Sequence, residues 1–230
     1  ERLVKIYCLI TERPPMSTGL YQLDEFKDNC GFGLIAHLKG SASHRILKTA
    51  IESLTCMTHR GGIAADGKTG DGCGLLLQKP DGFLRKVAKA ELGVDLADTY
   101  GIGSIMLSRD EEIASAARTI VEEELQAQGL KAVGWRTVPT DTHCLGPIAL
   151  ASLPQFSHLF IEPLSSYTDQ QLTAKLFMAR RRAENRLSSD KTFYIASFSN
   201  TVISYKGLMM PVDLPKFFTD LDDEDLKTAI

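Results

Sequence analysis

Apolar residues recur along the chain at two spacings, which indicates both helices and strands. Residues 44–58 and 83–92 carry apolar side chains three and four positions apart, as on one buried helix face, and Gly93 is expected to end the second helix. Short apolar runs predict strands over residues 31–38, 75–78 and 102–107. The glycine-dense stretch of residues 61–74 is expected to form a loop.

Two longer helices are predicted from side chains that cap their N-termini. Ser108 and Glu111 stand three residues apart ahead of a segment with helical periodicity, and so do Thr168 and Gln171. In such a capping box each side chain bonds a backbone N–H at the helix start, which satisfies donors that the first turn leaves unpaired. The first of these helices is expected to stop at Gly129.

A β-hairpin is predicted near the C-terminal end of the chain. Residues 193–198 and 201–205 are separated by Ser199-Asn200, so we expect them to pair as adjacent antiparallel strands. A purely parallel sheet has no place for so short a connection. The mixed order of strands and helices therefore predicts an α+β layered fold in one domain.

Composition and charge limit the kinds of binding partner and the cellular compartment that we expect. The 230 residues are 43% hydrophobic, enough for a sizeable core, and carry a formal charge of −3. This balance gives no electrostatic reason to expect a nucleic acid partner. The sequence shows no apolar stretch long enough for a membrane span or a secretory signal, so we expect no membrane partner and a cytoplasmic location.

The cysteines and histidines do not show the spacing of a metal site. The five cysteines are an odd, widely spaced set without a C-x-x-C pair, which argues against a disulfide framework or a zinc site and favours a reducing compartment. The histidines also lack metal-ligand spacing. We therefore expect no metal ion and no cofactor in this segment.

Residues 62–69 match the phosphate-loop pattern G-x-x-x-x-G-K-[ST] letter for letter, so a P-loop nucleotide binder is one alternative. That loop binds phosphate where a strand leads into it and a helix begins at its lysine. Here a predicted helix leads in, and Gly70, Gly72 and Gly74 follow at a spacing hostile to a helix. A turn-rich connection that contains the string by chance is the favoured interpretation.

Cys30 is the candidate nucleophile because of the chemistry that its position would allow. A cysteine thiol has a pKa of about 8.5 and needs a base at neutral pH, and an α-amine with a pKa of about 7.7–8.0 is well matched. If the bond between Asn29 and Cys30 is cut, one residue carries both groups. Gly31 and Gly33 would let a substrate approach the backbone beside the thiol. On spacing alone, a small buried cysteine at a strand start remains the alternative.

Three glycine-rich motifs together resemble one family. They are CGFGLIA at residues 30–36, THRGG at 58–62 and ADGKTGDGCG at 65–74, and the similarity continues in residues 133–136, 180–182 and 205–207. In combination they resemble the start of the glutamate synthase large subunit, a class II glutamine amidotransferase domain of the N-terminal-nucleophile hydrolase type. The resemblance implies a four-layer αββα sandwich, incomplete in this chain. It also implies that residues 1–29 are a propeptide or upstream extension, or residues 17–29 if Met16 is the native start, and that residues 30–230 are the N-terminal part of the domain.

The resemblance implies roles for individual residues. The thiol of Cys30 would attack the carboxamide of L-glutamine, ammonia would leave, and water would hydrolyse the thioester. The residues that it places in the active-site neighbourhood are Gly31, Arg60 and Gly61. Asp71 is expected to structure the glycine loop, together with Gly72, through hydrogen bonds from its side chain to the backbone.

The resemblance also implies a larger parent protein. Ammonia would pass to a downstream synthase region that converts 2-oxoglutarate to glutamate, with FMN and an iron–sulfur cluster there and FAD and NADPH on a partner, the glutamate synthase small subunit. The family's H-Q-R-F-S-T-N-like segment and its Asn-Gly oxyanion pair do not occur before Ile230. We therefore expect this chain alone to hydrolyse glutamine weakly or not at all. A non-catalytic interaction or assembly module with the same fold is the other alternative.

Overall fold

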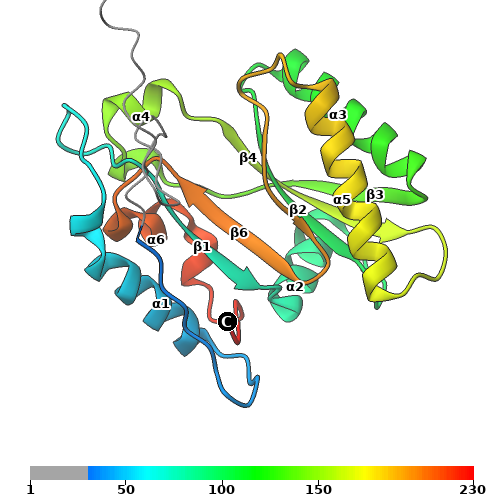
Figure 1. Ribbon diagram of the computed structural model, residues 1–230, viewed down its shortest axis with the longest axis horizontal. Helices are drawn as coiled ribbons and strands as arrows, with labels where there is room; N and C mark the ends of the chain where they lie inside the picture. Colours follow the sequence, from blue (N-terminus) through cyan, green and yellow to red (C-terminus); the bar gives the residue numbers. More distant parts are fainter. Residues whose placement is uncertain (1–30) are drawn as a thin grey trace, which may run out of the picture. The chain divides into compact units, whose positions relative to one another are not determined.

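The computed structural model of the chain describes residues 31–230 (Figure 1). The helices of this part are α1 (His44–Cys56), α2 (Asp81–Leu92), α3 (Glu111–Ala127), α4 (Pro147–Ala151), α5 (Asp169–Arg186) and α6 (Leu214–Phe217). The strands are β1 (Cys73–Gln78), β2 (Gly101–Leu107), β3 (Leu130–Thr137), β4 (Gln155–Pro163), β5 (Tyr194–Ser199) and β6 (Val202–Gly207). Short 3₁₀ turns are η1 (Thr58–Arg60), η2 (Thr142–Cys144), η3 (Pro211–Asp213) and η4 (Thr219–Asp222).

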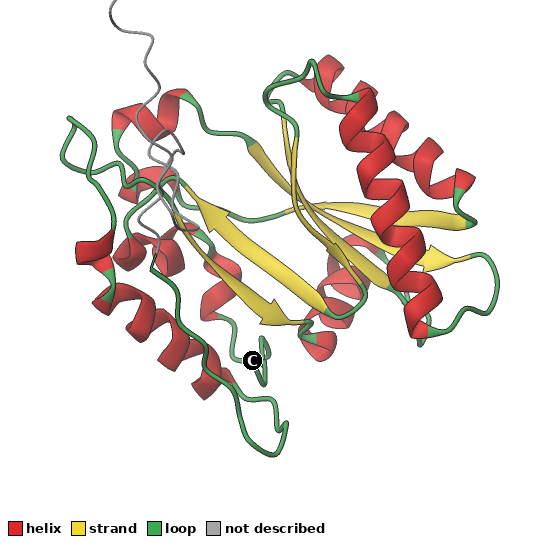
Figure 2. Ribbon diagram, viewed as in Figure 1, coloured by secondary structure: helices red, strands yellow, loops and turns green. Residues whose placement is uncertain are grey.

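The strands form two antiparallel sheets. Strands β3, β4, β2 and β5 lie side by side in that order, and β1 pairs with β6 in a separate two-stranded sheet. In Figure 2, α3 and α5 lie together beside the four-stranded sheet, and α1 lies beside the two-stranded sheet. The predicted α+β fold is confirmed.

Two clusters of buried apolar side chains hold these elements together. One cluster packs α3 and α5 against one face of the four-stranded sheet, and it includes Val121, Leu125, Leu172 and Leu176. The other cluster joins the four-stranded sheet to the β1–β6 sheet and to α1 and α2, and it includes Leu47, Leu77, Phe83 and Tyr205. Each sheet is therefore fixed by packing as well as by its hydrogen bonds.

Strand β4 shows why the apolar pattern misses the centre of the larger sheet. Leu159 and Ile161 pack in the cluster with α3 and α5, whereas Phe156 and Phe160 pack in the other cluster. A strand that is buried on both faces does not alternate between apolar and polar residues. The sequence pattern therefore does not predict β4.

Local signals at helix ends account for the helix predictions that are confirmed. The helix predicted over residues 44–58 is α1, and the predicted helix over residues 83–92 is α2. Gly93 ends α2 with a φ of 69°, a left-handed conformation that favours glycine. Thr168 and Gln171 form the capping box of α5. None of the helices within residues 31–230 has the length and apolar content to cross a membrane.

The predicted capping box of Ser108 and Glu111 is wrong. Asp110 caps α3, because its carboxylate accepts the backbone N–H groups of Glu112 (3.0 Å) and Ile113 (3.3 Å). Ser108 Oγ instead accepts the N–H of Asp110 (3.1 Å). A carboxylate directly ahead of the first turn binds the free N–H groups and also suits the positive end of the helix dipole.

The strand predicted over residues 31–38 is also wrong. These residues form no strand, and Phe32 is 92% and Leu34 77% exposed. A strand needs a neighbouring backbone with which to exchange hydrogen bonds. Within the described residues, this segment is tied to the distant chain by one backbone hydrogen bond, from the N–H of His37 to the carbonyl of Ala229 (2.8 Å). An apolar run without a pairing partner does not make a strand.

The two strands of the predicted hairpin exist, but they do not pair with each other. Strand β5 pairs with β2 in the larger sheet, and β6 pairs with β1 in the smaller one. Ser199 Oγ accepts the N–H groups of Thr201 (3.1 Å) and Val202 (3.3 Å), which turns the chain from one sheet to the other. Ser197 Oγ accepts the N–H of Ser204 (2.9 Å) across this junction. The connection is therefore a corner between sheets, made by serine side chains.

Gly74 in β1 tests how closely β1 and β6 approach. A Cβ at this position would lie 2.5 Å from Lys206 Cβ and 2.8 Å from the carbonyl oxygen of Tyr205. We expect Gly74→Ala to destabilise the chain by about 1–3 kcal/mol, the usual cost of overpacking. Gly82→Ala in α2 is the control, because nothing lies near its missing Cβ, and alanine there should stabilise by about 0.5–1 kcal/mol. Urea unfolding measures both, and shifts of equal sign would contradict this packing.

Candidate active site

The structure brings most of the predicted site residues to one loop. Arg60 is the last residue of η1, which follows α1 directly, and Gly61 donates its N–H to the carbonyl of Thr58 (3.3 Å). Gly31 is exposed and lies in no regular element. Cys30 lies outside the described residues, so its placement beside this loop stays a prediction.

The base of the loop is held by Asp71. Its Oδ2 accepts the N–H of Gly62 (2.6 Å), and its own N–H donates to the carbonyl of Gly62 (3.2 Å). Ala64 N–H donates to the carbonyl of Thr69 (2.8 Å), which continues this short antiparallel pairing toward the tip. Of these contacts, the hydrogen bond from the N–H of Gly62 joins the backbone to the side chain of Asp71. Residues 61–72 therefore form a closed, hairpin-like loop directly after Arg60.

The tip of the loop is organised by Asp66, whose importance the sequence reasoning missed. Its Oδ1 accepts the N–H groups of Lys68 (3.0 Å) and Thr69 (2.8 Å), and its Oδ2 accepts the hydroxyl of Thr69 (2.6 Å) and the N–H of Ile148 (3.1 Å). The hydroxyl of Thr69 and then its N–H hold the pKa of Asp66 well below its ordinary value. The carboxylate is therefore ionised at neutral pH. Its signal in the sequence was an Asp three residues before a Thr, typical of an Asx turn.

Two glycines are needed where the loop meets the end of β6. Gly72 has a φ of +125°, a conformation that side chains rarely adopt. A Cβ at Gly70 would lie 2.6 Å from the carbonyl oxygen of Met209, just beyond β6. Gly70 therefore allows the loop to approach the backbone of this segment closely, and Gly72 allows the backbone conformation that the loop needs there.

Residues 62–69 do not have the geometry of a phosphate loop. The segment follows η1 and leads into strand β1, so no helix begins at Lys68 or Thr69. Without a helix start, the backbone N–H groups that would bind phosphate are not aligned. The hydroxyl of Thr69 is engaged by Asp66. The geometry favours a turn-rich connection over a nucleotide site.

Two other thiols near the loop are poor nucleophiles. Burial, and then the negative charge of Asp213, raises the pKa of Cys73 to about 12. Burial also raises the pKa of Cys144. Since the thiolate is the reactive form, neither residue is expected to attack a substrate at neutral pH.

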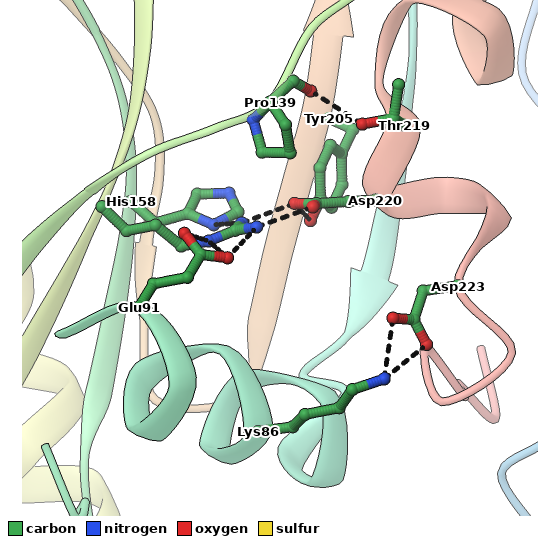
Figure 3. A network of polar contacts seen from close by, with 9 residues as sticks. Lys86, Glu91, Pro139, His158, Tyr205, Thr219, Asp220 and Asp223 are labelled. Carbon is green, nitrogen blue, oxygen red and sulfur yellow. Dashed lines mark hydrogen bonds and ion pairs between the residues drawn. The ribbon is translucent and has the colours of Figure 1, made fainter. Parts of the chain in front are cut away.

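A second polar centre lies in the core between the two sheets. The guanidinium of Arg136 donates to both carboxylate oxygens of Asp220 (2.6 and 2.8 Å), and its Nε lies 2.9 Å from both carboxylate oxygens of Glu91. Tyr205 donates its hydroxyl to Asp220 (3.0 Å). Figure 3 shows Glu91, His158, Tyr205 and Asp220 converging on this point. Arg136 is 3% and Asp220 5% exposed, so the pair is sealed from water.

The network fixes the charges of its members. Although burial opposes a charge on Arg136, its hydrogen bonds to Asp220 and Glu91 raise its pKa above the ordinary value. Burial, and to a lesser degree the nearby guanidinium, lowers the pKa of His158 to about 3, so this histidine is neutral. Burial and the charge of Asp220 raise the pKa of Tyr205 well above its usual range. His158 is thus a core histidine.

The sequence gives no local signal for this network. Asp220 belongs to an acidic run that is typical of a solvated helix start, but no helix follows it, and its partners come from β3 and β6. Within residues 31–230, no group of three or more His, Cys, Asp or Glu side chains is placed to hold a metal ion.

Comparison with known proteins assigns the chain to a family. The family model of glutamine amidotransferases class-II matches residues 30–230. The chain is 37% identical over 217 residues to the glutamate synthase [NADPH] large chain of Bacillus subtilis, which covers 94% of this chain and 14% of that protein. It is 33% identical to the ferredoxin-dependent glutamate synthase 2 of Synechocystis, over 86% of this chain and 13% of that protein.

A third relative gives the same picture. The glutamate synthase [NADPH] large chain of Azospirillum brasilense is 34% identical over 212 residues, which covers 90% of this chain and 14% of that protein. The chain therefore spans only about a seventh of the length of these curated relatives.

Proposed function

Because the chain belongs to the class-II glutamine amidotransferases, we propose that it hydrolyses glutamine within a larger glutamate synthase and that Cys30 is its nucleophile. The observation that carries this proposal is the extent of the family match, which begins at Cys30 itself. The glutamate synthase part of the proposal is supported by the names of the relatives.

The proposed reaction uses two groups of one residue. After the bond between Asn29 and Cys30 is cut, the α-amine of Cys30 accepts the thiol proton and the sulfur attacks the carboxamide carbon of glutamine. The C–N bond breaks, the leaving nitrogen takes a proton from the same amine, and a glutamyl thioester remains. Water then attacks the thioester carbon, which releases glutamate and restores the thiol. The other product, ammonia, is passed on.

Two of the described thiols, those of Cys73 and Cys144, contrast with the proposed nucleophile. The raised pKa values of Cys73 and Cys144 leave those thiols protonated, whereas a cysteine with a free α-amine has its own base. The loop of residues 61–72 is held by hydrogen bonds to the side chains of Asp66 and Asp71, and it begins at Gly61, directly after Arg60. We propose that these two residues line the surroundings of the thiol.

The fold proposal follows the order of the elements. We propose that α3 with α5, the four-stranded sheet, the two-stranded sheet and α1 are the four layers of an αββα sandwich of the N-terminal-nucleophile hydrolase type. The two packed clusters support this order, because one joins α3 and α5 to the larger sheet and the other joins the larger sheet to the smaller sheet and α1.

The rest of the parent protein would use the ammonia. We propose that a downstream synthase region makes glutamate from ammonia and 2-oxoglutarate with FMN and an iron–sulfur cluster, and that a small subunit with FAD and NADPH supplies electrons in the cytoplasm. The names of relatives include NADPH, NADH and ferredoxin. Comparing these three reductants with the full-length parent would identify its electron donor.

Labelling with a glutamine-like electrophile tests the proposed function. Diazo-oxo-norleucine should modify one thiol per full-length parent chain, and peptide mapping should find it on Cys30. The intact mass should show that the chain starts at Cys30, because only a terminal residue has the free α-amine. A parent that keeps residues ahead of Cys30 and still hydrolyses glutamine would overturn the proposal, and so would an unmodified, unprocessed chain, which would indicate an assembly module.

Cys73→Ser is the matched control for the labelling experiment. The raised pKa of Cys73 keeps its thiol protonated, so this variant should take up as much label as the unmodified sequence. Loss of the label in Cys73→Ser would show that Cys73, and not Cys30, is the reactive thiol.

A further inference from the structure

Asp66 lies within a motif that carries the family resemblance, but the resemblance gives it no role, and its side chain holds the loop next to Arg60 and Gly61. We propose that Asp66 is a positioning residue that, with Thr69, fixes the loop of residues 61–72 against α4 and thereby keeps Arg60 and Gly61 in place for glutamine hydrolysis. This inference rests on the proposed function. The evidence is that Asp66 and Thr69 make hydrogen bonds to α4 in addition to those of their own turn.

The side chain of Asp66 makes hydrogen bonds beyond its own turn. Two of its hydrogen bonds, to the N–H groups of Lys68 and Thr69, are those of an ordinary Asx turn. The same carboxylate also accepts the N–H of Ile148 (3.1 Å), in the first turn of α4. Thr69 Oγ1 donates to Asp66 and accepts the N–H of Ala149 (3.2 Å). Two side chains of the loop thus bind two backbone groups of α4.

Helix α4 is anchored in the core of the protein. Ala149 is buried and belongs to the core cluster that joins the two sheets. Thr69 is only 5% exposed, so its hydroxyl works in a site shielded from competing water. The loop tip is therefore bonded to the core of the protein.

Hydrogen bonds connect the tip of the loop to its base, so a shift of the tip also moves the base. The tip and the base are joined by the Ala64–Thr69 backbone hydrogen bond (2.8 Å) and by the contacts between Gly62 and Asp71. Gly62 directly follows Gly61. Five of the twelve residues from 61 to 72 are glycines, so without these bonds the segment would have wide conformational freedom.

Variants of Asp66 and Thr69 in the full-length parent test the inference. Asp66→Asn turns one acceptor oxygen into a donor that faces the N–H of Ile148, and Thr69→Val removes the hydroxyl while keeping the shape of the side chain. We expect each to lower kcat for glutamine hydrolysis about 10–100-fold with a much smaller change in KM, because misplaced groups chiefly weaken the transition state. Thr69→Ser, which keeps the hydroxyl, should retain most of the kcat of the unmodified parent.

The matched control is Asp190→Asn. Asp190 accepts the N–H (2.8 Å) and the hydroxyl (2.6 Å) of Thr192, so it makes the same kind of contact in the loop between α5 and β5. This variant should leave kcat and KM unchanged. Amide hydrogen exchange of residues 61–72, which needs no activity, should become faster in Asp66→Asn and Thr69→Val and stay unchanged in the control.

The outcomes separate this inference from the proposed function. If the unmodified parent hydrolyses glutamine and the loop exchanges faster in Asp66→Asn and Thr69→Val at unchanged kcat, the positioning role is overturned and the proposed function stands. Unchanged exchange in both variants would overturn the contacts themselves. If the unmodified parent does not hydrolyse glutamine, the proposed function fails and this inference fails with it. Should Asp66→Asn not fold, the comparison of kcat between Thr69→Val and Thr69→Ser tests the inference.

Discussion

Replacing Cys30 with alanine in the full-length parent is expected to lower glutamine hydrolysis by about 10⁴–10⁶-fold, the loss that follows when a covalent nucleophile is removed. Alanine keeps the α-amine but has no sulfur, so the base remains and the attacking atom is lost. Cys30→Ser should fare almost as badly, because a hydroxyl ionises far less readily than a thiol. Ammonia release measures the activity of each variant.

Two controls make this result specific to the sulfur. The intact mass of each variant shows whether residues 1–29 have been removed, so a failure of processing is not mistaken for a failure of chemistry. Cys73→Ser should retain the activity of the unmodified parent, since its thiol has a pKa of about 12. Glutamine hydrolysis that survives in a processed Cys30→Ala protein would show that another residue is the nucleophile.

Removing the carboxylate of Asp220 is expected to destabilise the chain by about 3–5 kcal/mol, the cost of leaving one partner of a buried ion pair. Arg136 would then remain in the core with only the half-exposed Glu91 to balance its charge, and the hydroxyl of Tyr205 would lose its acceptor. An unpaired charge in a medium of low polarity is unfavourable, and so is an unsatisfied hydroxyl. Urea unfolding of Asp220→Ala measures the loss.

Asp225→Ala is the control for the buried pair. Asp225 lies near Asp220 in the sequence and forms an ion pair with Lys86 of α2, but both side chains of this pair are exposed. Water and salt screen such a pair, so its loss should change stability far less. If the two variants unfold at the same urea concentration, the network of Arg136 does not stabilise the fold as its burial indicates.

The sequence predicts those features of the fold that neighbouring residues encode. Thr168 and Gln171 cap α5 because the two side chains need only each other and the first turn. Gly93 ends α2 for the same local reason. Where the partner is distant, the prediction fails. The apolar residues 31–38 lack a strand to pair with, and β5 and β6 separate into two sheets because β2 and β1 pair with them.

The candidate site divides in the same way. Cys30, Arg60 and Gly61 stay predictions, drawn from family motifs that are contiguous in the sequence. Asp66 lies in both the phosphate-loop string and a family motif, but neither indicates its role, because its decisive partner, Ile148, lies far along the chain. Asp220 was hidden for the same reason, since Arg136 and Tyr205 come from two other strands.

The pairing of β1 with β6 has a consequence for how the protein forms. Cys73 is opposite Gly207 and Gln78 is opposite Val202, so the smaller sheet joins the early and late parts of the described chain. At about 5–20 residues per second, a ribosome would need on the order of ten seconds to make β6 after β1. During that time β1 has no partner strand, and closing so long a loop is slow. The nascent chain is thus most exposed to misassociation at β1, the strand into which the glycine loop leads.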